Sequence, residues 1–311
     1  MESPGKDREN KMNTPIGFPF PKSAYLRLVE HQRKTKLLTY HPDLPLVLFI
    51  TFSRIAAGLS LVSVFLPSSP ARTGVAFIFM VLATLASIAH LKVPLRFLTM
   101  VRNNKSFLVW EIRLAGALTA FLALHFLSFL GYFERFHAWF PWATFILAIL
   151  FLISTGWAYR FETHPAWKTS LLPLFYIASA CMIGLVFRAM YYPFAALPLI
   201  YALLLVTQAL LLLLYRNHLK TTSPTALESL MTGNEKRTLL AFLWSAFLLP
   251  ALLTLFLQVH GYMEVVNIFL AISCSIGILL ERVLFFQVER PVFFLSFIAN
   301  PNGKGRYCVR G

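Results

Sequence analysis

The chain has 311 residues, of which 58% are hydrophobic, 15% are aromatic and only 13% are charged. Soluble domains average about 25% charged residues, so this composition excludes a soluble enzyme and predicts an integral membrane protein. A formal net charge of +15 would suit a nucleic-acid-binding protein, but the basic residues stand in loops and tails between apolar segments. Basic residues so placed orient a protein in a membrane. We therefore expect the lipid bilayer, and no nucleic acid, as a partner.

A transmembrane helix needs about 20 mostly apolar residues, and eight segments of the chain meet this requirement. In chain order they are about Leu44–Leu66, Val75–Leu91, Phe107–Gly131, Trp142–Tyr159, Ser170–Tyr191, Phe194–Tyr215, Arg237–Val259 and Val265–Gln287. The predicted fold is an all-α, polytopic membrane helix bundle. The predicted organisation is a polar, basic N-terminal segment (1–43), an eight-span membrane domain (44–290) and a basic C-terminal tail (291–311).

Lysine and arginine are distributed unevenly between the two sides of the predicted bundle. The side of the two termini has eight of them before Leu44 and more in the loops after the second, fourth and sixth spans. The opposite side has little beyond Arg72, Arg135 and Arg188. The positive-inside rule therefore places both termini in the cytoplasm.

A histidine and a glutamate lie at the side of the termini in this topology, because His90 ends the second span and Glu111 opens the third. An imidazole near neutral pH can bind a quinol oxygen and accept its proton, and a carboxyl group can relay protons. Two simpler roles stay open. His90 could contact lipid headgroups or cap its helix, and Glu111 could be a helix-start carboxylate stabilised by the helix dipole.

Other polar residues lie inside the spans, where ionisable groups usually face the bundle interior. Arg54 is roughly 15 Å deep in the first span, from the helical rise per residue, and we expect it to pair with a buried acid such as Glu111 or Glu281. Interior amides usually form interhelical hydrogen bonds. Several of these residues are expected to converge on one pocket. The candidates for quinol binding or proton relay are Arg54, Arg96, Gln208, Glu281 and Arg282.

The sequence predicts no haem, metal or iron–sulfur cluster in this chain. Its three cysteines form no CxxC pair, and an iron–sulfur cluster normally needs four thiolates. His125 lies roughly 27 Å from the start of the third span, at the side opposite His90, so the two cannot share one haem iron. His260 lies on the side of His125, but in a turn. Electrons from a quinol would have to leave through a partner.

Three runs of sequence resemble one known family in their order and spacing. His41-Pro42-Asp43-Leu44-Pro45 leads into Ala56-Ala57-Gly58, Ala89-His90-Leu91-Lys92-Val93-Pro94-Leu95-Arg96 follows, and Trp110-Glu111-Ile112 comes next. They resemble the membrane-anchor subunit of dimethyl sulfoxide reductase and its relatives, with a weaker match at Gly277, Glu281, Arg282 and Phe285. The resemblance implies an eight-span, haem-free anchor of the bacterial inner membrane. Such an anchor oxidises menaquinol and passes electrons to a four-cluster iron–sulfur subunit and then to a molybdopterin subunit.

Carried over by position, His90 corresponds to the quinol-site histidine of that family and Glu111 to its acid at the start of span three. The chain departs from the family in having Lys92 and Val93 where a glycine and a small residue are usual, and in the charge of Arg54. Family anchors also place the loop after span two outside the cytoplasm, whereas the charge distribution places it inside. A basic face would suit docking of an acidic ferredoxin-like subunit.

Two other functions compete with quinol oxidation. A small secondary transporter would use Arg54, Glu111 and Glu281 as its substrate site, although transporters often have inverted repeats and none is evident here. A purely structural anchor would have no redox site. Copurification with a ferredoxin-like subunit would exclude the transporter, and binding of a quinol analogue would exclude the passive anchor.

Overall fold

The computed structural model describes residues 43–65, 69–90, 107–160, 166–189, 197–232, 235–260 and 264–288. All of them belong to one unit, Pro42–Val292. The described residues are helical with turns between them and include no strand. Eight helical segments are long and apolar enough to cross a membrane. The predicted all-α, eight-span membrane bundle is therefore confirmed.

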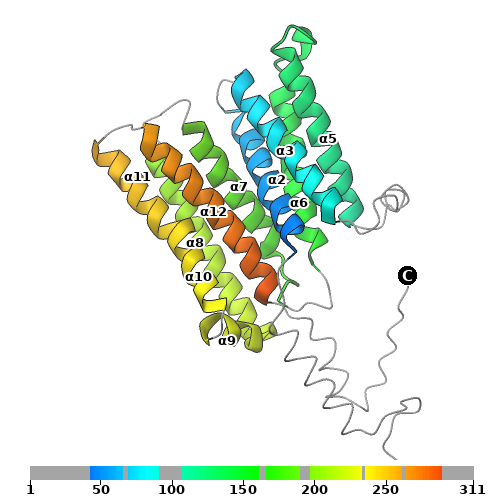
Figure 1. Ribbon diagram of the computed structural model, residues 1–311. Coiled ribbons are helices and arrows are strands. Elements are labelled where there is room, and N and C mark those ends of the chain that lie inside the picture. Colours follow the sequence, from blue (N-terminus) through cyan, green and yellow to red (C-terminus); the bar gives the residue numbers. More distant parts are fainter. Residues whose placement is uncertain are drawn as a thin grey trace, which may run out of the picture. The chain divides into compact units, whose positions relative to one another are not determined.

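The first four spans form one four-helix bundle (Figure 1). Its helices are α2 (Leu44–Val62), α3 (Pro70–His90), α5 (Phe107–Ser128) and α6 (Phe140–Ala158). Each packs on the next in chain order, and α6 closes the bundle by packing on α2. A short 3₁₀ helix, η2 (Glu134–Phe136), lies between α5 and α6.

The last four spans form a second bundle of the same kind. It consists of α7 (Leu171–Ala189), α8 (Leu197–Thr222), a composite seventh span and α12 (Glu264–Val288). The seventh span comprises α10 (Glu235–Leu243), the π-helical turn η3 (Trp244–Leu248) and α11 (Leu249–His260). A short helix, α9 (Pro224–Thr232), connects α8 to this span.

Several predicted spans differ from the helices of the structure, and three of these differences have a clear physical reason. The second span begins at Pro70 rather than Val75, because proline is well suited to the first turn of a helix. The sixth continues from Tyr215 to Thr222, since a helix need not end where its apolar stretch ends. The seventh contains a π-helical turn just before Pro250, whose missing N–H and bulky ring disturb regular α-helical bonding. Helix α9 was not predicted.

Glycine brings α2 and α7 into backbone contact where the two bundles meet. A Cβ atom at Gly58 would overlap the carbonyl oxygen of Ala180, and one at Gly184 would overlap the carbonyl oxygen of Gly58. Small residues permit this close approach between membrane helices. Arg54 lies one turn before Gly58, and Tyr176 lies one turn before Ala180. The glycine contact therefore holds Arg54 beside Tyr176.

Candidate functional site

The His90 run is described only in part. His90 is the last residue of α3, and the structure describes its backbone but not its side chain. Arg96, with Lys92, Val93 and Pro94, lies outside the described residues. Helices α3 and α5 are nevertheless antiparallel neighbours, because Gly74 near the start of α3 lies against Phe126 near the end of α5. His90 and Glu111 are therefore on the same side of the first bundle.

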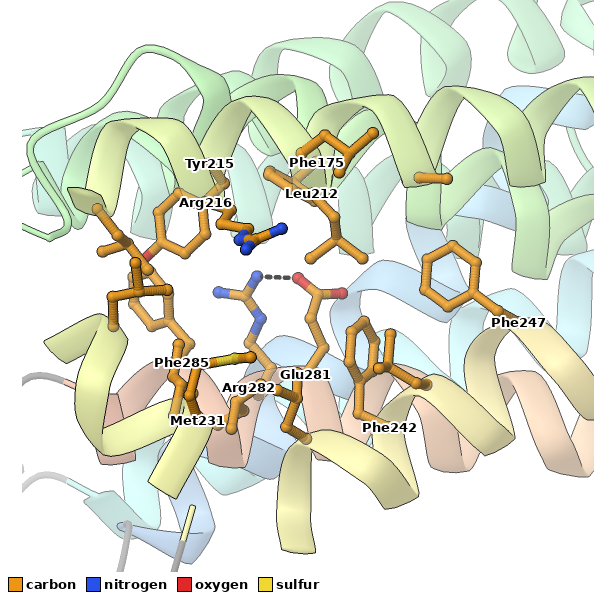
Figure 2. Close-up of a pocket in the computed structure, with 18 of the residues that line it drawn as sticks. Phe175, Leu212, Tyr215, Arg216, Met231, Phe242, Phe247, Glu281, Arg282 and Phe285 are labelled. Carbon is orange, nitrogen blue, oxygen red and sulfur yellow. Dashed lines mark hydrogen bonds and ion pairs between the residues drawn. The ribbon is translucent and has the colours of Figure 1, made fainter. Parts of the chain in front are cut away.

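A cavity of about 430 Å³ lies in the second bundle, bounded by α7, α8, α9, α10 and α12. Its wall is mostly aliphatic and aromatic. Figure 2 shows Glu281 and Arg282 entering from α12 and Arg216 from α8. Small-molecule sites usually occupy roughly 300–1,000 Å³ and combine an apolar wall with a few polar groups. The cavity therefore has the size and polarity of a site for an apolar ligand with a polar headgroup.

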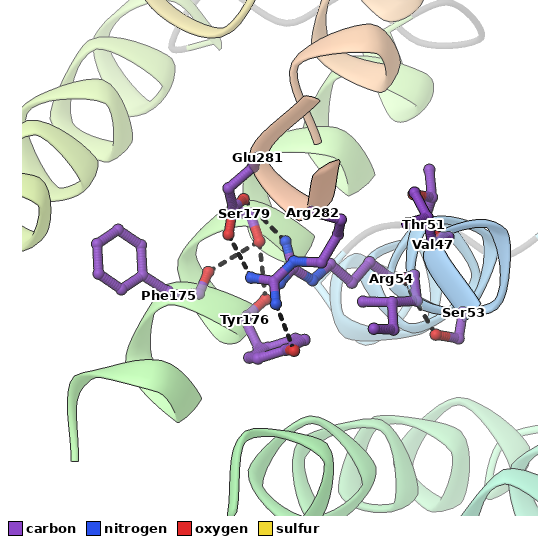
Figure 3. A network of polar contacts seen from close by, with 10 residues as sticks. Val47, Thr51, Ser53, Arg54, Phe175, Tyr176, Ser179, Glu281 and Arg282 are labelled. Carbon is purple, nitrogen blue, oxygen red and sulfur yellow. Dashed lines mark hydrogen bonds and ion pairs between the residues drawn. The ribbon is translucent and has the colours of Figure 1, made fainter. Parts of the chain in front are cut away.

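The acid in the cavity wall belongs to a buried ionic network (Figure 3). Nη1 of Arg54 donates a hydrogen bond of 2.9 Å to Oε2 of Glu281, and Nη2 of Arg282 pairs with Oε1 of the same carboxylate. The two arginine side chains are 0% and 1% exposed and that of Glu281 is 15% exposed. The predicted pairing of Arg54 with a buried acid is thus confirmed, and the acid is Glu281.

Tyr176 on α7 lies between the two arginines, and the sequence did not single it out. The guanidinium carbons of Arg54 and Arg282 lie 3.9 and 4.3 Å from the centre of its ring. Its hydroxyl accepts a hydrogen bond of 2.5 Å from Nη1 of Arg282. Cations are attracted to the face of an aromatic ring, most strongly when desolvated. A tyrosine within an apolar span was the only sequence signal, and it does not distinguish this role from ordinary packing.

Glu111 lies on α5, where it is 2% exposed. Thr155 of α6 is beside its carboxyl group. Neither Oε1 of Glu111 nor the Thr155 hydroxyl completes a hydrogen bond among the described residues. A buried ionised carboxylate without a partner is far more costly than a protonated one. The geometry is therefore suited to a carboxyl group that takes up and releases a proton.

Two buried tyrosines lie within electrostatic range of both Glu111 and the ionic network. Tyr176 interacts with Glu111 as well as with both arginines and Glu281, and buried Tyr159 interacts with Glu111, Tyr176 and both arginines. The sequence did not predict Tyr159 as part of the site either. Glu111 in the first bundle and the ionic network in the second therefore lie within electrostatic range of the same two tyrosines.

The remaining predicted residue, Gln208, is buried on α8 but does not line the cavity. Within the part of the chain that the structure describes, no group of three or more His, Cys, Asp or Glu side chains is placed to hold a metal ion. Of the predicted residues, the structure therefore brings together Arg54, Glu281 and Arg282, with Glu111 nearby.

Comparison with models of known protein families and with curated protein sequences finds no match to this chain.

Proposed function

We propose that this chain is the quinol-oxidising membrane anchor of an oxidoreductase complex in the bacterial inner membrane, of the kind that serves dimethyl sulfoxide reductase. The main support is the apolar cavity with a carboxylate–guanidinium pair in its wall and Tyr176 bonded to that pair, together with a second buried carboxyl group, Glu111, within electrostatic range of Tyr176. A menaquinol has the matching chemistry: an aromatic ring with two hydroxyl groups and a long apolar tail.

In this proposal the quinol ring lies in the cavity with one hydroxyl group against Glu281, rather than at His90 as the sequence alone suggests. Oxidation of one quinol yields one quinone, two protons and two electrons. The carboxylate of Glu281 accepts the proton of the first hydroxyl, and Arg282 stabilises the negative oxygen that forms; once Glu281 has passed this proton on, it accepts the second in the same way. Glu111 and His90 take protons onward to the surface. The electrons pass to a four-cluster iron–sulfur subunit and from there to a molybdopterin subunit.

Ligand binding tests the position of the headgroup. Purified protein should bind a fluorescent alkyl-hydroxyquinoline N-oxide, and Leu212→Trp should weaken this binding at least roughly tenfold, because the larger ring fills the cavity. Leu203→Trp, an exposed position on the same helix that does not line the cavity, is the matched control. Binding that survives Leu212→Trp but is lost in His90→Ala would move the quinol to the end of α3. Absence of binding in the unaltered protein would contradict quinol oxidation itself.

Proton transfer gives a second prediction. In the complete complex, Glu111→Gln should abolish quinol-dependent reduction of the iron–sulfur partner, because the amide cannot take up the proton, while the quinol analogue still binds. His90→Ala should have the same effect on reduction. Glu134→Gln changes an exposed acid in η2, between α5 and α6, and should leave the rate unchanged. Rapid quinol turnover in Glu111→Gln would exclude it from the proton path.

A secondary transporter for an organic or inorganic anion is the second candidate. Two arginines share one glutamate in the network, so the network has an excess of positive charge that would suit an anion. Among the described residues, Nε and Nη2 of Arg54 and Nε of Arg282 also have no hydrogen-bond partner. Copurification of iron–sulfur and molybdopterin subunits supports the anchor. Uptake of an anion by vesicles containing this chain alone supports the transporter.

A further inference from the structure

A second, smaller cavity lies in the first bundle, at the end opposite His90. It has a volume of about 20 Å³ and is enclosed by all four helices of that bundle. A cavity needs about 10–15 Å³ to hold one water-sized particle. The space therefore suits one monatomic ion or one water molecule and is too small for a phosphate or a carboxylate ligand.

The start of α3 supplies positive charge to this cavity. Arg72 is only 6% exposed and lines the cavity together with Ser69 and Thr73. Nε of Arg72 donates a hydrogen bond of 3.0 Å to Oγ of Ser69, which fixes the guanidinium group at the helix start. The amino-terminal end of a helix of this length also has a partial positive charge and attracts anions.

His125 adds an unsatisfied polar atom from α5. Its side chain is 1% exposed and lines the cavity, and its Nε2 atom has no hydrogen-bond partner within the described residues. The ring stacks with those of Phe129 and Phe140, with centroid distances of 5.3 and 5.9 Å. Buried polar atoms are rarely left without a partner. Because the stacking holds the ring in place, an N–H at Nε2 would donate to whatever occupies the cavity.

The sign of the lining charge favours an anion over a cation. Arg72 is charged, and none of the described lining residues is acidic. The Ser60 and Thr144 hydroxyls bond to carbonyl groups of their own helices. They can turn toward the cavity at little cost, since those carbonyls also accept helical N–H groups. We propose that this cavity binds a single chloride-sized anion, held by Arg72, His125 and the start of α3. This inference is independent of quinol oxidation.

Chloride-dependent stability tests the proposal in the detergent-solubilised full chain. The unfolding temperature should rise with sodium chloride but not with sodium gluconate at equal ionic strength, because an ion that binds only the folded state stabilises it. In Arg72→Gln, the chloride concentration that gives half of the effect should increase at least about tenfold, as expected for loss of a charged hydrogen bond. Arg135→Gln, an exposed arginine on the same side, is the matched control and should respond as the unaltered protein does.

His125→Phe keeps the aromatic stacking and removes the Nε2 donor, so it should also weaken the chloride response, and it remains informative if Arg72→Gln does not fold. Crystals soaked in bromide should give an anomalous peak between Arg72 and His125. Equal stability in chloride and gluconate, or a full chloride response in both variants, would overturn the proposal. So would a bromide-soaked crystal with no anomalous peak, which would indicate that the cavity holds water.

Discussion

Glu281→Gln is expected to lower the free energy of unfolding by about 3–5 kcal/mol, the usual cost of breaking a buried ion pair from one side. The reason is that Arg54 and Arg282 share this one carboxylate, so its loss leaves two buried guanidinium groups without a counter-charge. The thermal unfolding midpoint in detergent should fall by roughly 5–8 °C. Quinol-dependent electron transfer should also be lost, because the headgroup loses its proton acceptor.

The other members of the network give this prediction internal controls. Arg54→Met removes one cation but leaves Glu281 paired with Arg282, so it should destabilise the protein less than Glu281→Gln. Glu264→Gln alters an exposed acid at the first residue of the same helix and should change the midpoint little. If Glu281→Gln were as stable as Glu264→Gln, the shared carboxylate would not be what holds the two arginines in the bundle.

Gly184→Leu is expected to prevent the two bundles from packing. A side chain at this position would overlap the backbone of α2 at Gly58, and the backbone cannot move aside as a flexible side chain could. Overpacking of this kind usually costs 1–3 kcal/mol, and backbone overlap places the cost at about 3 kcal/mol or more. We expect a large fall in the yield of folded protein, measured by size-exclusion chromatography after detergent extraction.

Gly116→Leu is the matched control, since it makes the same substitution in a membrane helix where a Cβ atom would meet nothing within 4 Å. It should be tolerated, or even stabilise α5 by roughly 0.5–1 kcal/mol, because leucine favours a helix over glycine. Normal yield and stability of Gly184→Leu would mean that α2 and α7 can separate without loss of the fold.

Hydrophobicity and charge in the sequence were sufficient to predict the eight spans, because each is a local property of about 20 residues. The pairing of Arg54 with a buried acid also followed from the high cost of an unpaired charge in a bilayer. The sequence left open whether the partner was Glu111 or Glu281, since both lie at a suitable depth. The contact between Gly58 and Gly184 fixes α2 against α7, and this tertiary packing is not visible in a single sequence.

The cavity of about 430 Å³ in the second bundle could not be predicted from the sequence either, because it too depends on tertiary packing. It requires α9, whose sequence signals were a serine and proline at its start and apolar residues at Leu227, Leu230 and Met231. That spacing is helical, but at nine residues α9 is too short to register as a span. Tyr176 was missed because a tyrosine in an apolar segment is common, and only the positions of Arg54 and Arg282 on either side give it a role.

The π-helical turn at Trp244–Leu248 determines which side chains of the seventh span face the cavity. In a regular α-helix, residues five apart point about 140° away from each other, so Phe242 and Phe247 would lie on different faces. The wider turn brings residues five apart toward the same face. Their rings are in fact 5.7 Å apart, and both line the cavity. Deleting one residue of this turn would leave the two phenylalanines four apart in a regular helix, about 40° from each other, so both rings should stay in the ligand's wall while the π-helical turn is lost.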